Sequence, residues 1–271
     1  MSSSPESGDA LAFLNHTLPL QASNVARHRL PDGRFVWLKK ANAPHSIWRY
    51  RIQGLLTRSL GLDALAPVPN RGGTQAIAHE AGRLRELTAL GLPVPELLAH
   101  SPSGLLMTDL TEGREPASSL GDELALLAPR GADALLPAWR DGLQAIAGFH
   151  ARGTCLSQAF ARNMVRRPDG GIGCLDFEDR PQDVLPLPQC QARDWLSYLH
   201  ATAQLLREAQ ALAPAGQMMA DQLQQADPGT RQAMADIAQR THWLQGLPQG
   251  RRWGRDVQRL SALAQLLQAL R

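Results

Sequence analysis

The sequence predicts an α+β fold with two lobes, in which a small antiparallel sheet lies in the first half and helices dominate the second. Strand-like segments flank an Asp-Gly turn before residue 41 and recur between residues 95 and 110. From residue 132 onward, apolar residues recur mainly with the period of a helix. A polar, turn-rich stretch at 111–121 separates the two patterns and is the expected link between the lobes, with a cleft between them.

The elements of the first half follow in order. Residues 24–41 read as two strands joined at Asp32-Gly33, a dipeptide suited to a tight hairpin turn. Since side chains alternate along a strand, Trp37 and Lys39 share one face of the second strand. The pattern then predicts a helix over 45–61, a loop over 62–74, a helix over 75–90 that stops at Gly91, and strands over 95–99 and 104–110.

The second half is expected to be mainly helical. It begins with a helix over 132–151, followed by a β hairpin over 163–177 that turns at Asp169-Gly170-Gly171 and by helices from about residue 192 to the end. The expected organisation is an N-terminal extension at 1–22, a first lobe at 23–112 and a second lobe at 113–271.

Composition narrows the class of protein. The 271 residues are 44% hydrophobic and 20% charged, which is typical of a globular chain. No window approaches the roughly 18 to 20 apolar residues of a membrane-spanning helix, and the first twenty residues lack the pattern of a signal peptide. The three cysteines have no CxxC spacing, so they indicate neither a disulfide framework nor a zinc site. We therefore expect a soluble, cytoplasmic protein.

The basic residues are unusual in their kind. They number 28 against 25 acidic residues, and this excess is too weak to indicate a nucleic-acid partner. Only Lys39 and Lys40 are lysines, and the other basic residues are arginines. A lysine pair in an arginine-rich chain indicates a site that needs a compact ammonium group, with chance as the alternative.

Residues 149–179 carry the most informative pattern. A helix end is followed by a loop with Gln158 and Asn163, then by a hairpin and an apolar strand that leads to Asp176 and Glu178. This order resembles the catalytic loop and metal-binding segment of the protein-kinase-like superfamily, in which His-x-Asp precedes an Asn by five positions and a hairpin ends in Asp-Phe-Gly or Asp-Phe-Glu. The resemblance implies that Asn163, Asp176 and Glu178 hold magnesium beside ATP and that Gln158 takes the place of the catalytic base.

Further segments extend the resemblance over roughly residues 25–200. Residues 36–39, Val-Trp-Leu-Lys, resemble the strand whose lysine contacts the α and β phosphates, which leaves Lys40 facing away. Glu80 then takes the position of the glutamate that pairs with this lysine. The strand at 104–110 resembles the one before the hinge, and the resemblance implies that backbone groups of Asp109, Leu110 and Glu112 meet an adenine ring.

The resemblance also bears on the substrate. Asp194 resembles the buried aspartate that braces the catalytic loop through backbone N–H groups. Only 17 residues separate it from Asp176, too few for the peptide-binding segment of protein kinases. The short connection and the Gly-Leu-Pro-Val-Pro turn at 91–95 are similar to those of bacterial small-molecule and lipopolysaccharide-core kinases. We therefore expect a phosphotransferase that acts on a non-peptide hydroxyl, with a lipopolysaccharide-core sugar as one candidate.

Two departures from the family pattern leave a second function open. No glycine-rich loop precedes Lys39, and the His-x-Asp motif has become Leu156-Ser157-Gln158. A glutamine amide can orient a hydroxyl but cannot accept its proton, and general base catalysis contributes about 10²–10⁴ in rate. The alternative is thus a pseudokinase, a nucleotide-binding or protein-interaction module without turnover. An aminoglycoside-type kinase would need an acidic acceptor pocket, which the arginine-rich second half does not indicate.

Each candidate residue also has a purely structural interpretation. Asp176 and Glu178 could be solvated acids at a strand end, Asn163 and Gln158 loop residues, Glu80 half of a surface ion pair, and His150 a helix cap. A hydrolase is disfavoured because no G-x-S-x-G elbow surrounds Ser157.

The C-terminal segment 250–271 is arginine-rich and amphipathic. Such a helix usually packs on its own domain. The functional alternative is peripheral contact with an anionic membrane or glycolipid through Arg251, Arg252 and Arg255 beside Trp253, at the inner face of the cytoplasmic membrane.

Overall fold

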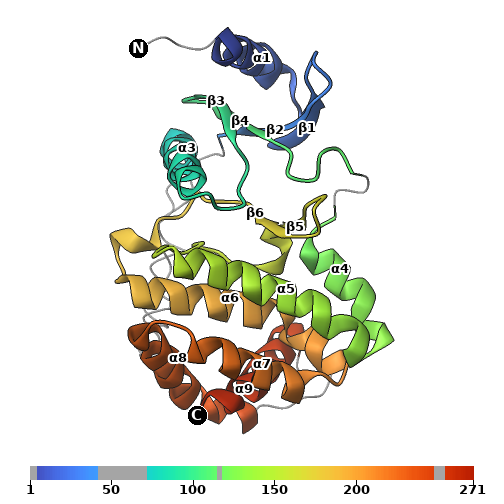
Figure 1. The fold of residues 1–271 in the computed structure, drawn as a ribbon, viewed down its shortest axis with the longest axis vertical. Coiled ribbons are helices and arrows are strands. Elements are labelled where there is room, and N and C mark those ends of the chain that lie inside the picture. Colours follow the sequence, from blue (N-terminus) through green and yellow to red (C-terminus); the bar gives the residue numbers. More distant parts are fainter. Residues whose placement is uncertain (1–4, 42–71, 115–117, 247–253) are drawn as a thin grey trace. The chain divides into compact units, whose positions relative to one another are not determined.

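The computed structural model describes residues 5–41, 72–114, 118–246 and 254–271 (Figure 1). These residues form two compact units. The first unit consists of residues 5–41, 72–114 and 165–180, and the second of residues 118–164, 181–246 and 254–271. The expected helix at 45–61 and most of the expected loop at 62–74 lie outside the described residues.

The first unit is built on a four-stranded antiparallel sheet with the order β1-β2-β4-β3. Its strands are β1 (Val25–Arg29), β2 (Phe35–Lys40), β3 (Leu97–Ser101) and β4 (Gly104–Thr108). The turn between β1 and β2 lies at Asp32-Gly33 as predicted, with Gly33 at a φ of 92°, a conformation that glycine adopts without strain. The register places Lys39 opposite Val25 on one side and Leu105 on the other.

Helix α1 (Pro5–Leu20) lies within the segment interpreted as an N-terminal extension, residues 1–22. Leu14 on this helix is fully buried in an apolar cluster with Val36, Leu38 and Leu106 of the sheet. Figure 1 shows α1 beside the sheet. The helix is thus part of the first unit, because it covers an apolar sheet face that would otherwise be exposed to water.

Helix α3 (Gly73–Ala89) follows the prediction closely at its end. Leu90 is the C-cap, and Gly91 has a φ of 69°, the left-handed conformation in which helices commonly terminate. The buried face of the helix includes Ile77, Leu84 and, unusually, Glu80. Because a buried carboxylate requires a partner, the burial of Glu80 indicates a polar site inside the first unit.

The hairpin of β5 (Met164–Arg166) and β6 (Ile172–Cys174) forms where the sequence predicts it. Residues 165–180 nevertheless belong to the first unit, whereas the expected boundary assigned everything after residue 112 to the second. The Cys174 N–H donates to the Pro93 carbonyl at 2.9 Å, and Gly173 packs closely against Leu110. These long-range contacts hold the hairpin to the first unit and carry the following segment, residues 175–180, with it.

The second unit is helical. Its helices are α4 (Leu120–Leu127), α5 (Ala132–Ala151), α6 (Leu187–Glu208), α7 (Leu212–Gln224), α8 (Pro228–Arg240) and α9 (Arg255–Leu266), with short 3₁₀ turns at Ala128–Arg130, Ala161–Asn163, Pro181–Asp183, His242–Gly246 and Leu267–Leu270. Helix α5 has the predicted bounds. Helix α6 begins earlier than residue 192, because Pro188 fits the first turn, where no N–H donor is needed.

The core of the second unit lies between α5 and α6. Trp139 and Tyr198 are buried and stacked with ring centroids 5.9 Å apart. The Tyr198 hydroxyl donates to the Trp139 carbonyl at 2.8 Å, and the Trp139 indole donates to Thr202 at 2.9 Å. Gly142 allows this close approach, because a Cβ there would overlap the Tyr198 phenol.

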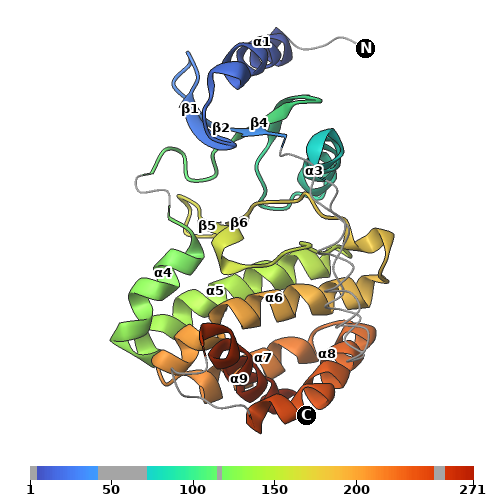
Figure 2. The ribbon, with the colours of Figure 1, turned by 180° about the vertical axis from the view of Figure 1, so that it is seen from behind.

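Helix α9 lies against α6 and α7 (Figure 2). Leu263, Ala264, Leu266 and Leu267 are buried within the second unit. The described part of the C-terminal segment thus packs on its own unit, which favours the structural interpretation of its apolar face. The arginines and tryptophan at 251–253 lie outside the described residues. In the part of the chain that the structure describes, no helix has the length and apolar character to cross a membrane.

Candidate functional site

An ion pair between Lys39 and Glu80 forms the centre of the candidate site in the first unit. Lys39 is near the end of β2 and Glu80 is in the middle of α3, and both are buried. The Lys39 Nζ lies 2.8 Å from Glu80 Oε2. The contact that the resemblance implied is therefore present. Lys40, on the opposite face of the strand, donates to the Gln21 carbonyl instead.

Two further carboxylates contact the same ammonium group. Asp176 Oδ1 lies 3.1 Å and Glu178 Oε1 lies 2.8 Å from Lys39 Nζ. Between them, Phe177 is fully buried, and its N–H donates to Glu80 Oε1 at 3.4 Å. The segment after β6 thus brings both acids to the lysine. The contact of Glu178 with Lys39 was not foreseen from the sequence, because nothing local indicates which way that side chain points.

The backbone at Asp176 is in a sparsely populated conformation. Its φ is 68°, the left-handed region that non-glycine residues seldom adopt, although Asp and Asn do so more readily than most. Such conformations cost of order 1–3 kcal/mol and persist where surrounding contacts fix them. Here the burial of Phe177 and the ion pair with Lys39 fix the segment.

The cluster carries one positive and three negative charges. Burial of the Lys39 ammonium opposes its charged form, but the charges of Glu80, Asp176 and Glu178 outweigh this, so the pKa of Lys39 is raised. Burial also raises the pKa of Glu80, and the attraction of Lys39 acts in the opposite direction. Lys39 is therefore a permanent cation at neutral pH.

Asp109, predicted as part of a hinge that meets adenine, uses its side chain to build a turn. Its carboxylate accepts from the N–H and hydroxyl of Thr111, at 2.9 and 2.8 Å, and from the Gly113 N–H at 3.1 Å. Arg27 lies 3.5 Å from the same carboxylate. The turn after β4 is therefore held in one conformation by buried hydrogen bonds.

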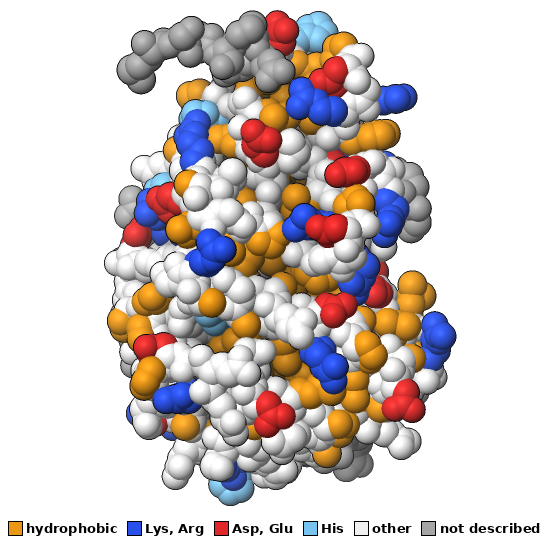
Figure 3. All heavy atoms as spheres, in the orientation of Figure 1, with side chains coloured by type: hydrophobic (Ala, Val, Ile, Leu, Met, Phe, Trp, Pro, Cys, Tyr) orange, Lys and Arg blue, Asp and Glu red, His pale blue; other side chains and the backbone are white. Residues whose placement is uncertain are grey.

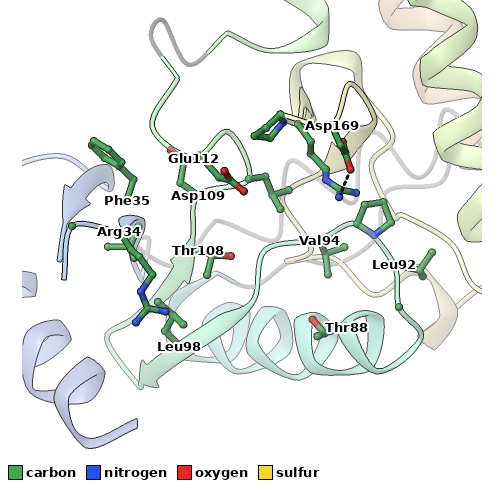
Figure 4. Close-up of a pocket in the computed structure, with 17 residues that line it drawn as sticks. Arg34, Phe35, Thr88, Leu92, Val94, Leu98, Thr108, Asp109, Glu112 and Asp169 are labelled. Atoms are coloured by element: carbon green, nitrogen blue, oxygen red, sulfur yellow. Dashed lines mark hydrogen bonds and ion pairs between the residues drawn. The ribbon is translucent and has the colours of Figure 1, made fainter. Parts of the chain in front are cut away.

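A pocket of about 930 Å³ lies beside the turn that follows β4 (Figure 4). Asp109, Leu110 and Glu112 line it, together with residues of β2, of the α3–β3 connection and of the hairpin tip at 167–169. The acids and the lysine of the ion cluster are not among its lining residues. The three predicted hinge residues thus share one pocket, and the predicted phosphate-binding residues share a separate cluster in the same unit.

Gln158 and Asn163 lie in the second unit. The Asn163 side-chain amide donates to the Gln158 carbonyl at 3.2 Å, and the Phe160 N–H donates to the same carbonyl at 2.8 Å. These bonds close the loop between the two residues. The residues predicted to hold magnesium thus belong to different units. Asn163 is in the second unit, and Asp176 and Glu178 are in the first.

Asp194 braces the loop before Gln158, as the resemblance implied. Its carboxylate is fully buried and accepts from the Leu156 N–H at 2.7 Å. It also lies 3.0 Å from His150 Nε2. His150 therefore has a specific side-chain partner on α6, which the expected role as a helix cap did not include. The sequence carried no signal for this pair, because its members lie on different helices.

The donor set in the first unit suits a hard divalent cation in part. Carboxylate oxygens are the ligands that magnesium prefers, and Asp176 and Glu178 converge on one nitrogen. Among the described residues, no group of three or more His, Cys, Asp and Glu side chains has a metal-binding arrangement. The chemistry therefore fits a cation that two protein carboxylates hold and that takes its other ligands from phosphate and water.

On the face shown in Figure 3, acidic and basic side chains are interspersed among the described residues. No protein-family model matches this chain, and a search of curated proteins found no match. The described residues form a mixed α+β protein.

Proposed function

We propose that the chain has a two-lobed protein-kinase-like fold and is an ATP- and magnesium-dependent phosphotransferase. The observation that carries this proposal is the buried Lys39–Glu80 pair with Asp176 on the same ammonium group. A carboxylate that orients a lysine beside a second, more exposed carboxylate suits phosphate oxygens bridged by a metal ion. Helix α3, which lies between β2 and β3 in the chain and supplies Glu80, supports the same fold.

The proposed roles follow from the chemistry of each group. Lys39 binds phosphate oxygens and Glu80 orients it. Asp176 and Glu178 would hold magnesium, which would neutralise charge on the transferring phosphoryl group. Gln158 orients the acceptor hydroxyl, and backbone groups of Asp109 to Glu112 meet the base. The acceptor is a non-peptide hydroxyl, with a lipopolysaccharide-core sugar at the inner face of the cytoplasmic membrane as the first candidate.

Ligand-dependent stability tests the nucleotide site. A ligand that binds only the native state stabilises it, by about 2.7 kcal/mol at one hundred times its dissociation constant. We expect ATP with magnesium to raise the unfolding temperature of the wild type and to have a smaller effect on Asp176→Asn. No shift at millimolar ATP would contradict the proposal. If the shift is present, labelled ATP and lipopolysaccharide-core sugars then test transfer.

A pseudokinase is the second candidate, and Gln158 favours it. Its backbone carbonyl is held by Asn163 and Phe160, and its side chain has no carboxylate with which to accept a proton. Gln158→Asp discriminates the two functions. In a phosphotransferase that lacks a base, the new carboxylate is expected to raise turnover, by up to about 10². Nucleotide binding without transfer in either form would favour the pseudokinase.

A further inference from the structure

Three protein carboxylates surround the Lys39 ammonium group. Three carboxylate oxygens, from Glu80, Glu178 and Asp176, lie 2.8, 2.8 and 3.1 Å from its nitrogen. A phosphate oxygen that approaches Lys39 must therefore replace one of these acceptors. It also meets a cluster whose formal charge is −2, so the free site disfavours an anion.

The three acids differ in how firmly they are held. The Glu80 side chain is 1% exposed, on the buried face of α3, and also accepts from the Phe177 N–H. The side chains of Glu178 and Asp176 are 17% and 38% exposed. A ligand from solvent can thus reach Asp176 and Glu178 while Glu80 stays on the lysine.

We propose that a divalent cation opens the Lys39 site to phosphate by drawing Asp176 and Glu178 away from the ammonium group. This inference rests on the proposed function and adds an order of events to it. The cation replaces two carboxylate contacts of Lys39 and cancels the excess negative charge. Lys39 keeps its ion pair with Glu80, and its ammonium group becomes accessible to phosphate oxygens. Because coupling between two ligands is reciprocal, polyphosphate in turn increases the affinity for the cation.

The experiment measures the binding of ATP and of inorganic tripolyphosphate to the full-length protein by calorimetry, in EDTA and in magnesium. Glu178→Gln is the informative variant, because it removes one competing charge and keeps the shape of the side chain. We expect its affinity for both probes in EDTA to be about tenfold higher than that of the wild type. Its gain in affinity on adding magnesium is expected to be smaller. Glu86→Gln is the matched control, since Glu86 lies on α3 and pairs with Arg83 at 3.2 Å.

Asp176→Asn provides a second test should Glu178→Gln fail to fold. Asparagine tolerates the positive φ of residue 176. It is expected to raise the affinity for tripolyphosphate in EDTA in the same way. If the metal only bridges protein and phosphate, the affinity for both probes in EDTA should be the same in both variants as in the wild type.

The outcomes separate the inference from the function on which it rests. If ATP binds the wild type but both variants match Glu86→Gln in EDTA, the inference is overturned and the proposed function stands. If neither probe binds any form of the protein in either condition, both are overturned. Higher affinity of the variants in EDTA, with a weaker response to magnesium, supports both.

Discussion

The Lys39 ammonium group lies 2.8 Å from the Glu80 carboxylate, and both side chains are almost inaccessible to solvent. Burial of one such charge alone costs several kcal/mol, so each residue requires the other. The pair links β2 to α3, and Asp176 and Glu178 contact the same ammonium group. The ion cluster is thus a structural element of the first unit as well as its candidate binding site.

Removal of the lysine is expected to destabilise the protein strongly. Lys39→Met leaves three carboxylates near one another without a cation, and a broken buried pair costs about 3–5 kcal/mol. Lys40→Met is the matched control, because Lys40 is the next residue of the same strand and makes one hydrogen bond to a carbonyl. We expect it to cost about 1 kcal/mol. Urea unfolding monitored by circular dichroism measures both, and equal losses would refute a special role for Lys39.

The stability difference between the wild type and Lys39→Met is expected to depend on pH. Because the folded-state pKa of Lys39 is raised above its ordinary value of 10.5, the folded state keeps the proton after the unfolded chain has lost it. The stability that Lys39 contributes is therefore complete below about pH 10.5 and declines as the pH rises towards the folded-state value. The difference in unfolding free energy between wild type and Lys39→Met should decrease by about 1.4 kcal/mol for each pH unit above pH 10.5. A constant difference between pH 9 and pH 11.5 would argue against the shift.

Much of the first unit could be predicted because its signals are local. Alternation along 24–41 fixes the face of Lys39, and Gly91 marks the end of α3. The role of residues 5–20 could not be predicted in this way. Whether a short helix packs on the rest of the chain depends on an apolar surface that is distant in sequence. Here that surface is the sheet face around Val36 and Leu106.

The candidate site was only partly accessible to sequence reasoning for the same physical reason. The family resemblance named Lys39, Glu80 and Asp176 as site residues, and the structure brings the three side chains together. The contact of Glu178 with Lys39 and that of His150 with Asp194 depend on side-chain directions in three dimensions. The assignment of residues 165–180 to the first unit likewise follows from a long-range contact, the hydrogen bond from the Cys174 N–H to the Pro93 carbonyl.

Loss of Asp194 is expected to release the loop that carries Gln158. Asp194→Ala removes the acceptor of the Leu156 N–H and the partner of His150, which together should cost about 3 kcal/mol. Hydrogen exchange at the Leu156 amide should become faster by more than the global loss of stability explains. Asp236→Ala, an exposed acid on α8 that bonds to Gln232, should change stability by less than about 0.5 kcal/mol. Unchanged protection of Leu156 would show that other contacts hold the loop.

One substitution at two positions of α5 should have opposite effects. Gly142→Ala places a methyl group where the Tyr198 phenol lies, and overpacking of this kind costs about 1–3 kcal/mol. Gly148→Ala meets no neighbouring atom within 4 Å and gains about 0.5–1 kcal/mol from the higher helix propensity of alanine. Chemical unfolding of both variants tests the packing of α5 on α6. A Tyr198→Leu background should remove most of the Gly142→Ala penalty, because the smaller side chain leaves room for the methyl group. A penalty that persists in that background would place its cause outside the contact with Tyr198.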